Sequence, residues 1–147
     1  ILDWYKKAEG VEQYPIEQDP GVLSVKKIYH YYKQQGIHTQ VMGASFRSTA
    51  QVLGLAGCDL LTIAPNLLAQ LEQDQQTITA QLSTATAQQA EKIERAEQTK
   101  ASFKAELEQD LMAFQLLQGG IDGFIKAREQ LSRLLRQSFG IDAEIKA

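Results

Sequence analysis

The sequence has little of several residue types that mark particular protein classes. It contains one cysteine, Cys58, which excludes a disulfide framework and fits a reducing cytosol. Its two histidines, His30 and His38, have no acidic or cysteine partner at ligand spacing, so we interpret them as solvated side chains. No apolar run approaches the roughly 20 residues of a membrane helix. We therefore expect no disulfide, no metal site and no membrane span.

Positive charge is also scarce. The formal net charge is -3 and the isoelectric point is near 5.4, whereas a nucleic-acid surface needs a basic face. The first residues show no charged and apolar regions of a secretory signal, so we expect a cytoplasmic protein. Cys58 directly precedes an apolar run, which favours a structural thiol over a nucleophile. The 147 residues suffice for one ordinary core.

Residues 39–65 organise the rest of the chain. They predict a short strand at 40–42, a small-residue loop, a helix ended by Gly57, and a second strand at 60–63. A strand, a helix and a strand at this spacing form a βαβ unit, whose strands are parallel and are expected to be buried on both faces. The fold class that follows is α/β.

Two side chains follow the first strand, where ligands bind in such folds. Ser45 offers a hydroxyl and Arg47 a planar guanidinium, and with the first amides of the next helix they would suit a phosphate dianion. A structural alternative stays open, in which Ser45 caps the helix and Arg47 pairs with a nearby carboxylate. From the residues alone both interpretations stay open, with Ser45 and Arg47 as the candidate phosphate site.

The flanking segments are predicted to be helical or polar. Helical spacing of apolar residues predicts helices at 1–8, at 22–35 with Gly36 as its end, and from Pro65 onwards. Residues 72–101 are rich in Gln, Thr, Ala and Glu and predict a solvated connection that buries little. Two apolar stripes in 102–147, separated by Gly119 and Gly120, predict two C-terminal helices.

The central motifs carry a resemblance. VMGASFR followed by LAGCDLLTIAP is similar to the transaldolase family, the Schiff-base sugar-phosphate enzymes of the pentose phosphate pathway. ILDWYK, DPGV and IYHYYK extend the similarity upstream, and DLMA extends it downstream. Two positions depart from the family pattern: Ser48 replaces a common asparagine, and Leu60 replaces a usually polar or basic residue. The resemblance covers nearly the whole chain, densely to about residue 71.

The resemblance implies a fold and an organisation. A (β/α)8 TIM barrel needs eight strands and about 200 residues or more, and this chain offers two convincing strands. The resemblance assigns them to the last two strands, followed by long C-terminal helices. We therefore expect a single partial domain over 1–147, with barrel βα units in 1–71, a polar connection in 72–101 and C-terminal helices in 102–147.

The resemblance also implies a reaction. The whole enzyme would move a dihydroxyacetone unit from a ketose phosphate, sedoheptulose 7-phosphate or fructose 6-phosphate, to an aldose phosphate through a lysine Schiff base, without a cofactor. Ser45 and Arg47 match the family positions that hold the substrate phosphate. Asp59, at the start of a strand, reads as a turn or cap residue rather than a catalytic acid.

The Schiff-base lysine itself is not predicted in this chain. None of its lysines lies in or at the end of a predicted strand, so we expect no catalytic residue here and no activity from these residues alone. The ten lysines are Lys6, Lys7, Lys26, Lys27, Lys33, Lys92, Lys100, Lys104, Lys126 and Lys146.

Two other kinds of protein stay open as alternatives. One is a non-catalytic, phosphate-binding half-barrel that assembles through its helical tail, and the other is a helical interaction module. The expected partners are sugar phosphates, with no nucleic acid and no membrane, and the sequence leaves the oligomeric state unknown.

Overall fold

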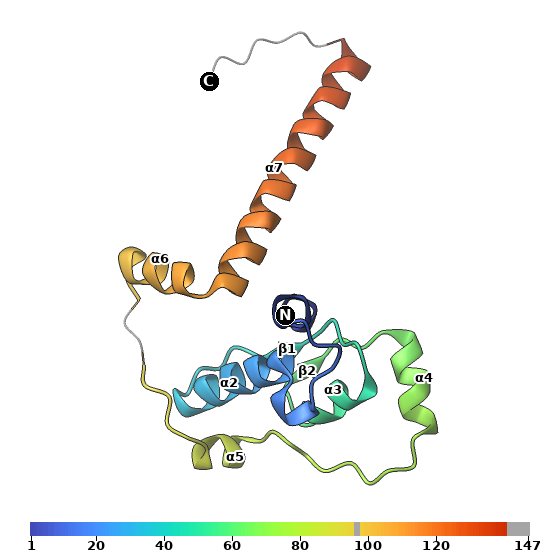
Figure 1. Cartoon of the computed structure of the whole chain (residues 1–147), viewed down its shortest axis with the longest axis vertical. Coiled ribbons are helices and arrows are strands. Elements are labelled where there is room, and N and C mark those ends of the chain that lie inside the picture. Colours follow the sequence, from blue (N-terminus) through green and yellow to red (C-terminus); the bar gives the residue numbers. More distant parts are fainter. Residues whose placement is uncertain (96–97, 141–147) are drawn as a thin grey trace. The chain divides into compact units, whose positions relative to one another are not determined.

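The computed structural model describes residues 1–95 and 98–140 (Figure 1). The chain divides into two compact units, Ile1–Glu97 and Gln98–Ala147. The elements of the first unit, in chain order, are α1 (Leu2–Glu9), the short 3-10 helix η1 (Ile16–Gln18), α2 (Pro20–Gln34), β1 (Met42–Gly43), α3 (Thr49–Gly54), β2 (Leu60–Leu61), α4 (Pro65–Gln73) and α5 (Thr84–Gln89). The second unit contains α6 (Lys100–Gln109) and α7 (Leu111–Phe139).

The predicted βαβ unit is present. β1 and β2 are parallel neighbours in a two-stranded sheet, with Met42 opposite Leu60, and α3 makes the crossover between them. The strands are shorter than predicted, and the expectation that both faces are buried is wrong for two residues. Met42 is 55% exposed and Leu60 is 45% exposed, so the face that carries this residue pair is only partly covered.

Helix α2 confirms the prediction for residues 22–35, although it begins two residues earlier. Asp19 is its N-cap and accepts from the backbone amides of Gly21 at 2.8 Å and Val22 at 3.1 Å. Gly36, just past its end, has a φ of +65°. The apolar side of α2 supplies two core side chains, which are both nearly fully buried: Val22 and Tyr29.

Helix α3 ends at Gly54, three residues before the predicted stop. Leu55 is its C-cap, so the prediction that Gly57 caps the helix is wrong. Gly57 instead lies in the following turn with a φ of +95°. The carbonyl of Ala56 accepts from the amides of Gln81, at 2.8 Å, and Leu82, at 3.0 Å, and therefore leaves the helical pattern.

The same contact ties a polar segment to the core. Leu82 is 2% exposed and Ala87 is fully buried, so the expectation that 72–101 buries little is wrong at these two positions. Helix α5 packs against α2, and the Gln34 side chain of α2 donates to the Ala87 carbonyl at 2.9 Å. The composition of this segment predicts solvated side chains, but its small side chains pack between helices and the amide side chain of Gln34 forms a hydrogen bond that bridges α2 and α5.

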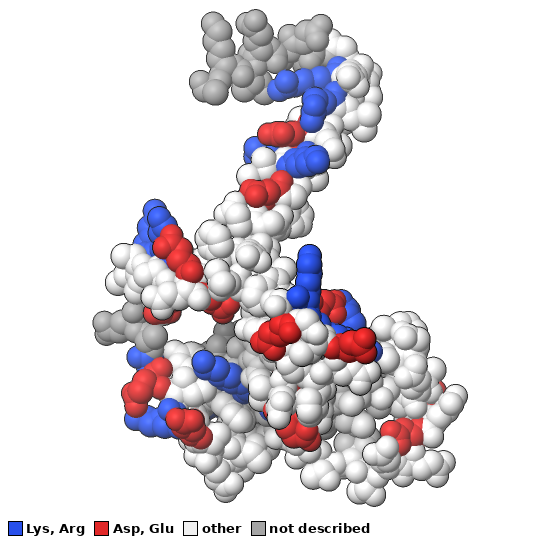
Figure 2. All heavy atoms as spheres, viewed as in Figure 1, with Lys and Arg blue, Asp and Glu red and all other residues white. Residues whose placement is uncertain are grey.

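The break between the two helices of the second unit lies at a different place from the one predicted. α6 ends at Gln109, and Asp110 begins α7 by accepting from the Ala113 amide at 2.9 Å. Gly119 and Gly120 lie inside α7, so the prediction of a break there is wrong: the Asp110 cap offers a better helix start than the glycine pair offers a stop. Figure 2 shows that the charged side chains of α7 gather toward its C-terminal half. Lys146 lies outside the described residues.

An ion pair joins α2 to the start of both strands. The Lys33 ammonium lies 2.8 Å and 2.9 Å from the two carboxylate oxygens of Asp59, and Asp59 also accepts from the Val41 amide at 2.9 Å. The hydrogen bond from Lys33, with that from Val41, lowers the pKa of Asp59, and the bond to Asp59 raises the pKa of Lys33. Asp59 is therefore a tertiary bridge rather than the predicted turn or cap residue.

This ion pair gives an expected pH dependence. Because the folded pKa of Asp59 is lowered, its contribution to stability is complete above about pH 4 and is lost as the pH falls through the folded pKa. Because the pKa of Lys33 is raised, its contribution is complete below about pH 10 and is lost as the pH rises through the folded pKa. Urea unfolding should show Asp59→Asn less stable than the parent at pH 7, with a smaller difference at pH 3. An equal difference at both values would show that the charge of Asp59 contributes nothing.

Candidate functional site

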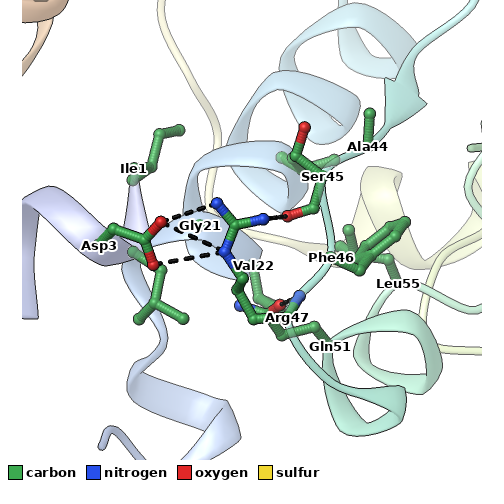
Figure 3. Close-up of a pocket in the computed structure, with 12 residues that line it drawn as sticks. Ile1, Asp3, Gly21, Val22, Ala44, Ser45, Phe46, Arg47, Gln51 and Leu55 are labelled. Atoms are coloured by element: carbon green, nitrogen blue, oxygen red, sulfur yellow. Dashed lines mark hydrogen bonds and ion pairs between the residues drawn. The ribbon is translucent and has the colours of Figure 1, made fainter. Parts of the chain in front are cut away.

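The loop between β1 and α3 borders a pocket of about 300 Å³. Ser45 and Arg47, the two predicted site residues, both line it, together with residues from α1 and α2 (Figure 3). The remaining lining residues are Ile1, Leu2, Asp3, Gly21, Val22, Val25, Ala44, Phe46, Gln51 and Leu55. The pocket therefore has apolar side chains from α1, from α2 and from Leu55, and a polar rim from the loop.

The guanidinium of Arg47 is held on two sides. Its Nε and Nη2 donate to the carboxylate of Asp3 on α1, with Nη2 at 2.7 Å, and its Nη1 donates to the Ser45 carbonyl at 3.2 Å (Figure 3). The hydrogen bond from Arg47 lowers the pKa of Asp3. The side chains of Arg47 and Asp3 are 56% and 63% exposed, so the pair contributes more to orientation than to stability.

The pairing alternative for Arg47 is thus confirmed, and it leaves capacity for a ligand. A guanidinium carries five N–H donors, and the contacts with Asp3 and Ser45 engage three of them. Within residues 1–95 and 98–140, the second N–H of Nη1 and the second N–H of Nη2 meet no acceptor. These donors belong to a planar fork that matches phosphate or carboxylate oxygens.

Ser45 is not a helix cap, so the capping alternative is wrong. The N-cap of α3 is Ser48, whose hydroxyl accepts from the Gln51 amide at 3.3 Å. Ser45 has a φ of +60°, in the left-handed region that non-glycine residues rarely adopt. Left-handed non-glycine residues are concentrated at ligand sites, where the surrounding structure maintains them.

Two backbone amides near the start of α3 are occupied. The Arg47 amide donates to the Gln51 side chain at 2.7 Å, and the Ser48 hydroxyl accepts from the Gln51 amide. Anion binding by the other first amides of α3 stays a prediction. The polar chemistry of the rim comes from the Ser45 hydroxyl and the Arg47 side chain.

Phe46 packs beneath the loop. It is partly buried against the core, and a Cβ added at Gly43 would lie 3.0 Å from its ring and 3.1 Å from Leu55. Gly43 therefore lets the end of β1 lie close to these side chains. The packing turns Phe46 inward, while its neighbours in sequence, Ser45 and Arg47, are exposed at the pocket.

Sequence reasoning missed three residues that shape the site. Asp3 pairs with Arg47 across 44 positions, and the buried side chains of Asp19 and Gln51 bond to each other at 2.7 Å. An acidic residue before Pro20 is a recognisable helix start and could have identified Asp19 as a cap. No local pattern could have paired Asp3 with Arg47 or Asp19 with Gln51.

The other candidate residues show no shared site. The Cys58 thiol is half-buried and contacts the Val41 carbonyl at 3.2 Å, in keeping with a structural role. His30 is half-buried, and desolvation, helped by Lys26, lowers its pKa. Among the described residues, no group of three His, Cys, Asp or Glu side chains could hold a metal ion. In the same residues, no helix combines the length and apolar character needed to cross a bilayer.

Comparison with known proteins gives one consistent result. A family model described as Transaldolase/Fructose-6-phosphate aldolase matches residues 1–135. The chain is similar to the transaldolase of Cellvibrio japonicus, with 48% identity over 136 residues that cover 92% of this chain and 42% of that protein. It is also similar to the transaldolase of Methylococcus capsulatus, with 50% identity over 135 residues that cover 92% of this chain and 41% of that protein. The chain thus spans about two fifths of the length of these curated relatives.

Proposed function

Because this chain belongs to the Transaldolase/Fructose-6-phosphate aldolase family, we propose that it supplies the phosphate-binding part of a transaldolase site. The observation that carries this proposal is the position of Ser45 and Arg47 on the rim of one pocket, directly after β1. In barrels of parallel strands and helices, phosphate sites are built from the loops after the last strands. The parallel β1–α3–β2 unit is compatible with the last two strands of such a barrel.

In this proposal the whole enzyme transfers a dihydroxyacetone unit from sedoheptulose 7-phosphate or fructose 6-phosphate to an aldose phosphate. A lysine forms a Schiff base with the ketose carbonyl, which lets the bond between C3 and C4 break and release an aldose phosphate. The retained three-carbon unit then adds to the carbonyl of a second aldose phosphate. No cofactor is required, and the reaction fits a cytoplasmic enzyme of the pentose phosphate pathway.

Arg47 and Ser45 hold the phosphate of the ketose until the first aldose phosphate leaves, and then hold the phosphate of the second aldose phosphate. The guanidinium offers two further N–H donors toward the anion, and the Ser45 hydroxyl offers a third. Asp3 fixes the plane of the guanidinium, because its carboxylate accepts from Nε and Nη2. The pocket binds the charged end of the sugar and leaves the carbonyl end to the Schiff-base lysine.

The lysines of the chain support the view that the Schiff-base lysine does not belong to residues 1–147. A Schiff-base amine needs a lowered pKa, whereas the hydrogen bond to Asp59 raises the pKa of Lys33. Lys33 also binds Asp59, which accepts from the amide of Val41 just before β1, whereas Ser45 follows the other end of that strand. We therefore propose that the reacting lysine lies outside residues 1–147 and that these residues alone do not catalyse the transfer.

Borohydride trapping tests this proposal. The natural protein that carries this chain is incubated with fructose 6-phosphate and sodium borohydride, and the digested product is analysed by mass spectrometry. We expect a reduced three-carbon adduct on a lysine outside the ten present here. An adduct on one of these ten lysines would overturn the proposal that the reacting lysine lies outside residues 1–147. No adduct, combined with tight binding of fructose 6-phosphate, would favour the non-catalytic phosphate-binding half-barrel.

A further inference from the structure

Two buried polar side chains, Gln51 and Asp19, lie next to the loop between β1 and α3. Gln51 is 7% exposed and Asp19 is 4% exposed, and burial of such groups is costly unless their hydrogen bonds are made. Gln51 donates from Nε2 to Asp19 at 2.7 Å and accepts at Oε1 from the Arg47 amide, also at 2.7 Å. Gln51 therefore joins α3 to α2 and to the backbone of the loop.

Asp19 determines which way the Gln51 amide faces. One carboxylate oxygen of Asp19 is held by the amides of Gly21 and Val22 at the start of α2, and the other accepts from Gln51. A carboxylate accepts hydrogen bonds and cannot donate them when ionised, so it selects the NH2 end of Gln51. The carbonyl end of Gln51 must then face the Arg47 amide.

The hydrogen bond to Gln51 lies next to the strained part of the loop. Ser45, two residues before Arg47, has a φ of +60°, and such a conformation persists only where neighbouring contacts maintain it. The Arg47 amide is fixed by Gln51, and the Arg47 side chain bonds back to the Ser45 carbonyl. The loop is thus held from behind by Gln51 and across its rim by Arg47.

We propose that Gln51, oriented by Asp19, is a positioning residue that holds the loop so that the Ser45 hydroxyl and the Arg47 guanidinium face one anion. The inference rests on the proposed phosphate-binding function of Ser45 and Arg47. Gln51 does not bind the phosphate itself, because its amide carbonyl is occupied by Arg47 and its NH2 faces Asp19. It acts through the geometry of the loop.

Three variants of the natural protein test the proposal. Gln51→Met has a similar length and makes neither hydrogen bond. The double variant Gln51→Glu with Asp19→Asn exchanges donor and acceptor between the two side chains, so both bonds can form again. Gln70→Glu, at an exposed position on α4, is the matched surface control. NMR follows the dissociation constant for inorganic phosphate and the hydrogen exchange of the Arg47 amide.

Gln51→Met is expected to raise the dissociation constant for inorganic phosphate by about tenfold, and to speed exchange of the Arg47 amide by at least as much, while the Tyr29 amide of α2 keeps its rate. The double variant and Gln70→Glu should stay within about threefold of the parent for both quantities. Either unchanged phosphate affinity or unchanged Arg47 exchange in folded Gln51→Met would overturn the proposal, and so would failure of the double variant to restore them.

The same experiment separates this inference from the function on which it rests. If inorganic phosphate leaves the Ser45 and Arg47 resonances of the parent protein unshifted, the phosphate site itself is refuted. If phosphate binds there and Gln51→Met binds it equally well, the phosphate site stands and the positioning role of Gln51 is refuted.

Discussion

Gly57→Ala is expected to destabilise the protein more than any other single methyl addition at a glycine of the first unit. A Cβ at Gly57 would lie 2.0 Å from the carbonyl oxygen of Leu82, which is backbone and cannot swing away. That backbone is held in place by the hydrogen bonds from Gln81 and Leu82 to Ala56. The φ of +95° at Gly57 adds backbone strain for any residue with a Cβ.

The expected loss is at least about 3 kcal/mol of the free energy of unfolding, or roughly 10 °C in Tm. Gly10→Ala is the matched control, because Gly10 also has a positive φ, +69°, but an added Cβ there meets nothing within 4 Å. The control should lose only about 1 kcal/mol. Urea and thermal unfolding of both variants measure the difference, and equal losses would show that Leu82 does not lie against Gly57.

Arg47→Ala is expected to remove most of the preference for phosphorylated sugar. A hydrogen bond to a charged group contributes about 1.5 to 3 kcal/mol, so kcat/KM for fructose 6-phosphate should fall by at least about tenfold. For unphosphorylated fructose, kcat/KM should change by less than about threefold, because no anion is held. Steady-state kinetics on the natural protein with both sugars measure the ratio.

Two further variants sharpen this test. Arg47→Lys keeps the positive charge but loses the planar fork and the two-point contact with Asp3, so it should recover only part of the preference. Arg133→Ala, on the exposed surface of α7, is the control for loss of a cation elsewhere. An unchanged preference in Arg47→Ala would remove Arg47 from the substrate site.

Local sequence signals predicted most of the first unit. The apolar spacing along 22–35 and the proline signal at Pro65 correspond to helices α2 and α4. Signals failed where a distant contact competed with a local preference. Gly57 is typical of a helix stop, but glycine is required there because the backbone of Leu82, 25 positions away, leaves no room for a Cβ. The presence of a glycine in the sequence does not distinguish these two uses.

The site was predictable only in part. Ser45 and Arg47 could be named because the carboxyl end of a strand is a known place for ligands, and the structure brings both to one pocket. Their supports could not be named. Asp3 and Gln51 act through contacts that tertiary folding creates, and the sequence contains no periodicity or motif that records such contacts.

The left-handed backbone at Ser45 has a consequence for how this position can evolve. Serine there costs about 1 kcal/mol relative to glycine, which adopts the same conformation freely. Selection for stability alone would therefore favour glycine at this position. If the hydroxyl binds phosphate as proposed, lineages that lose this use are expected to replace serine with glycine at position 45, and the residue found there would mark whether the use is retained.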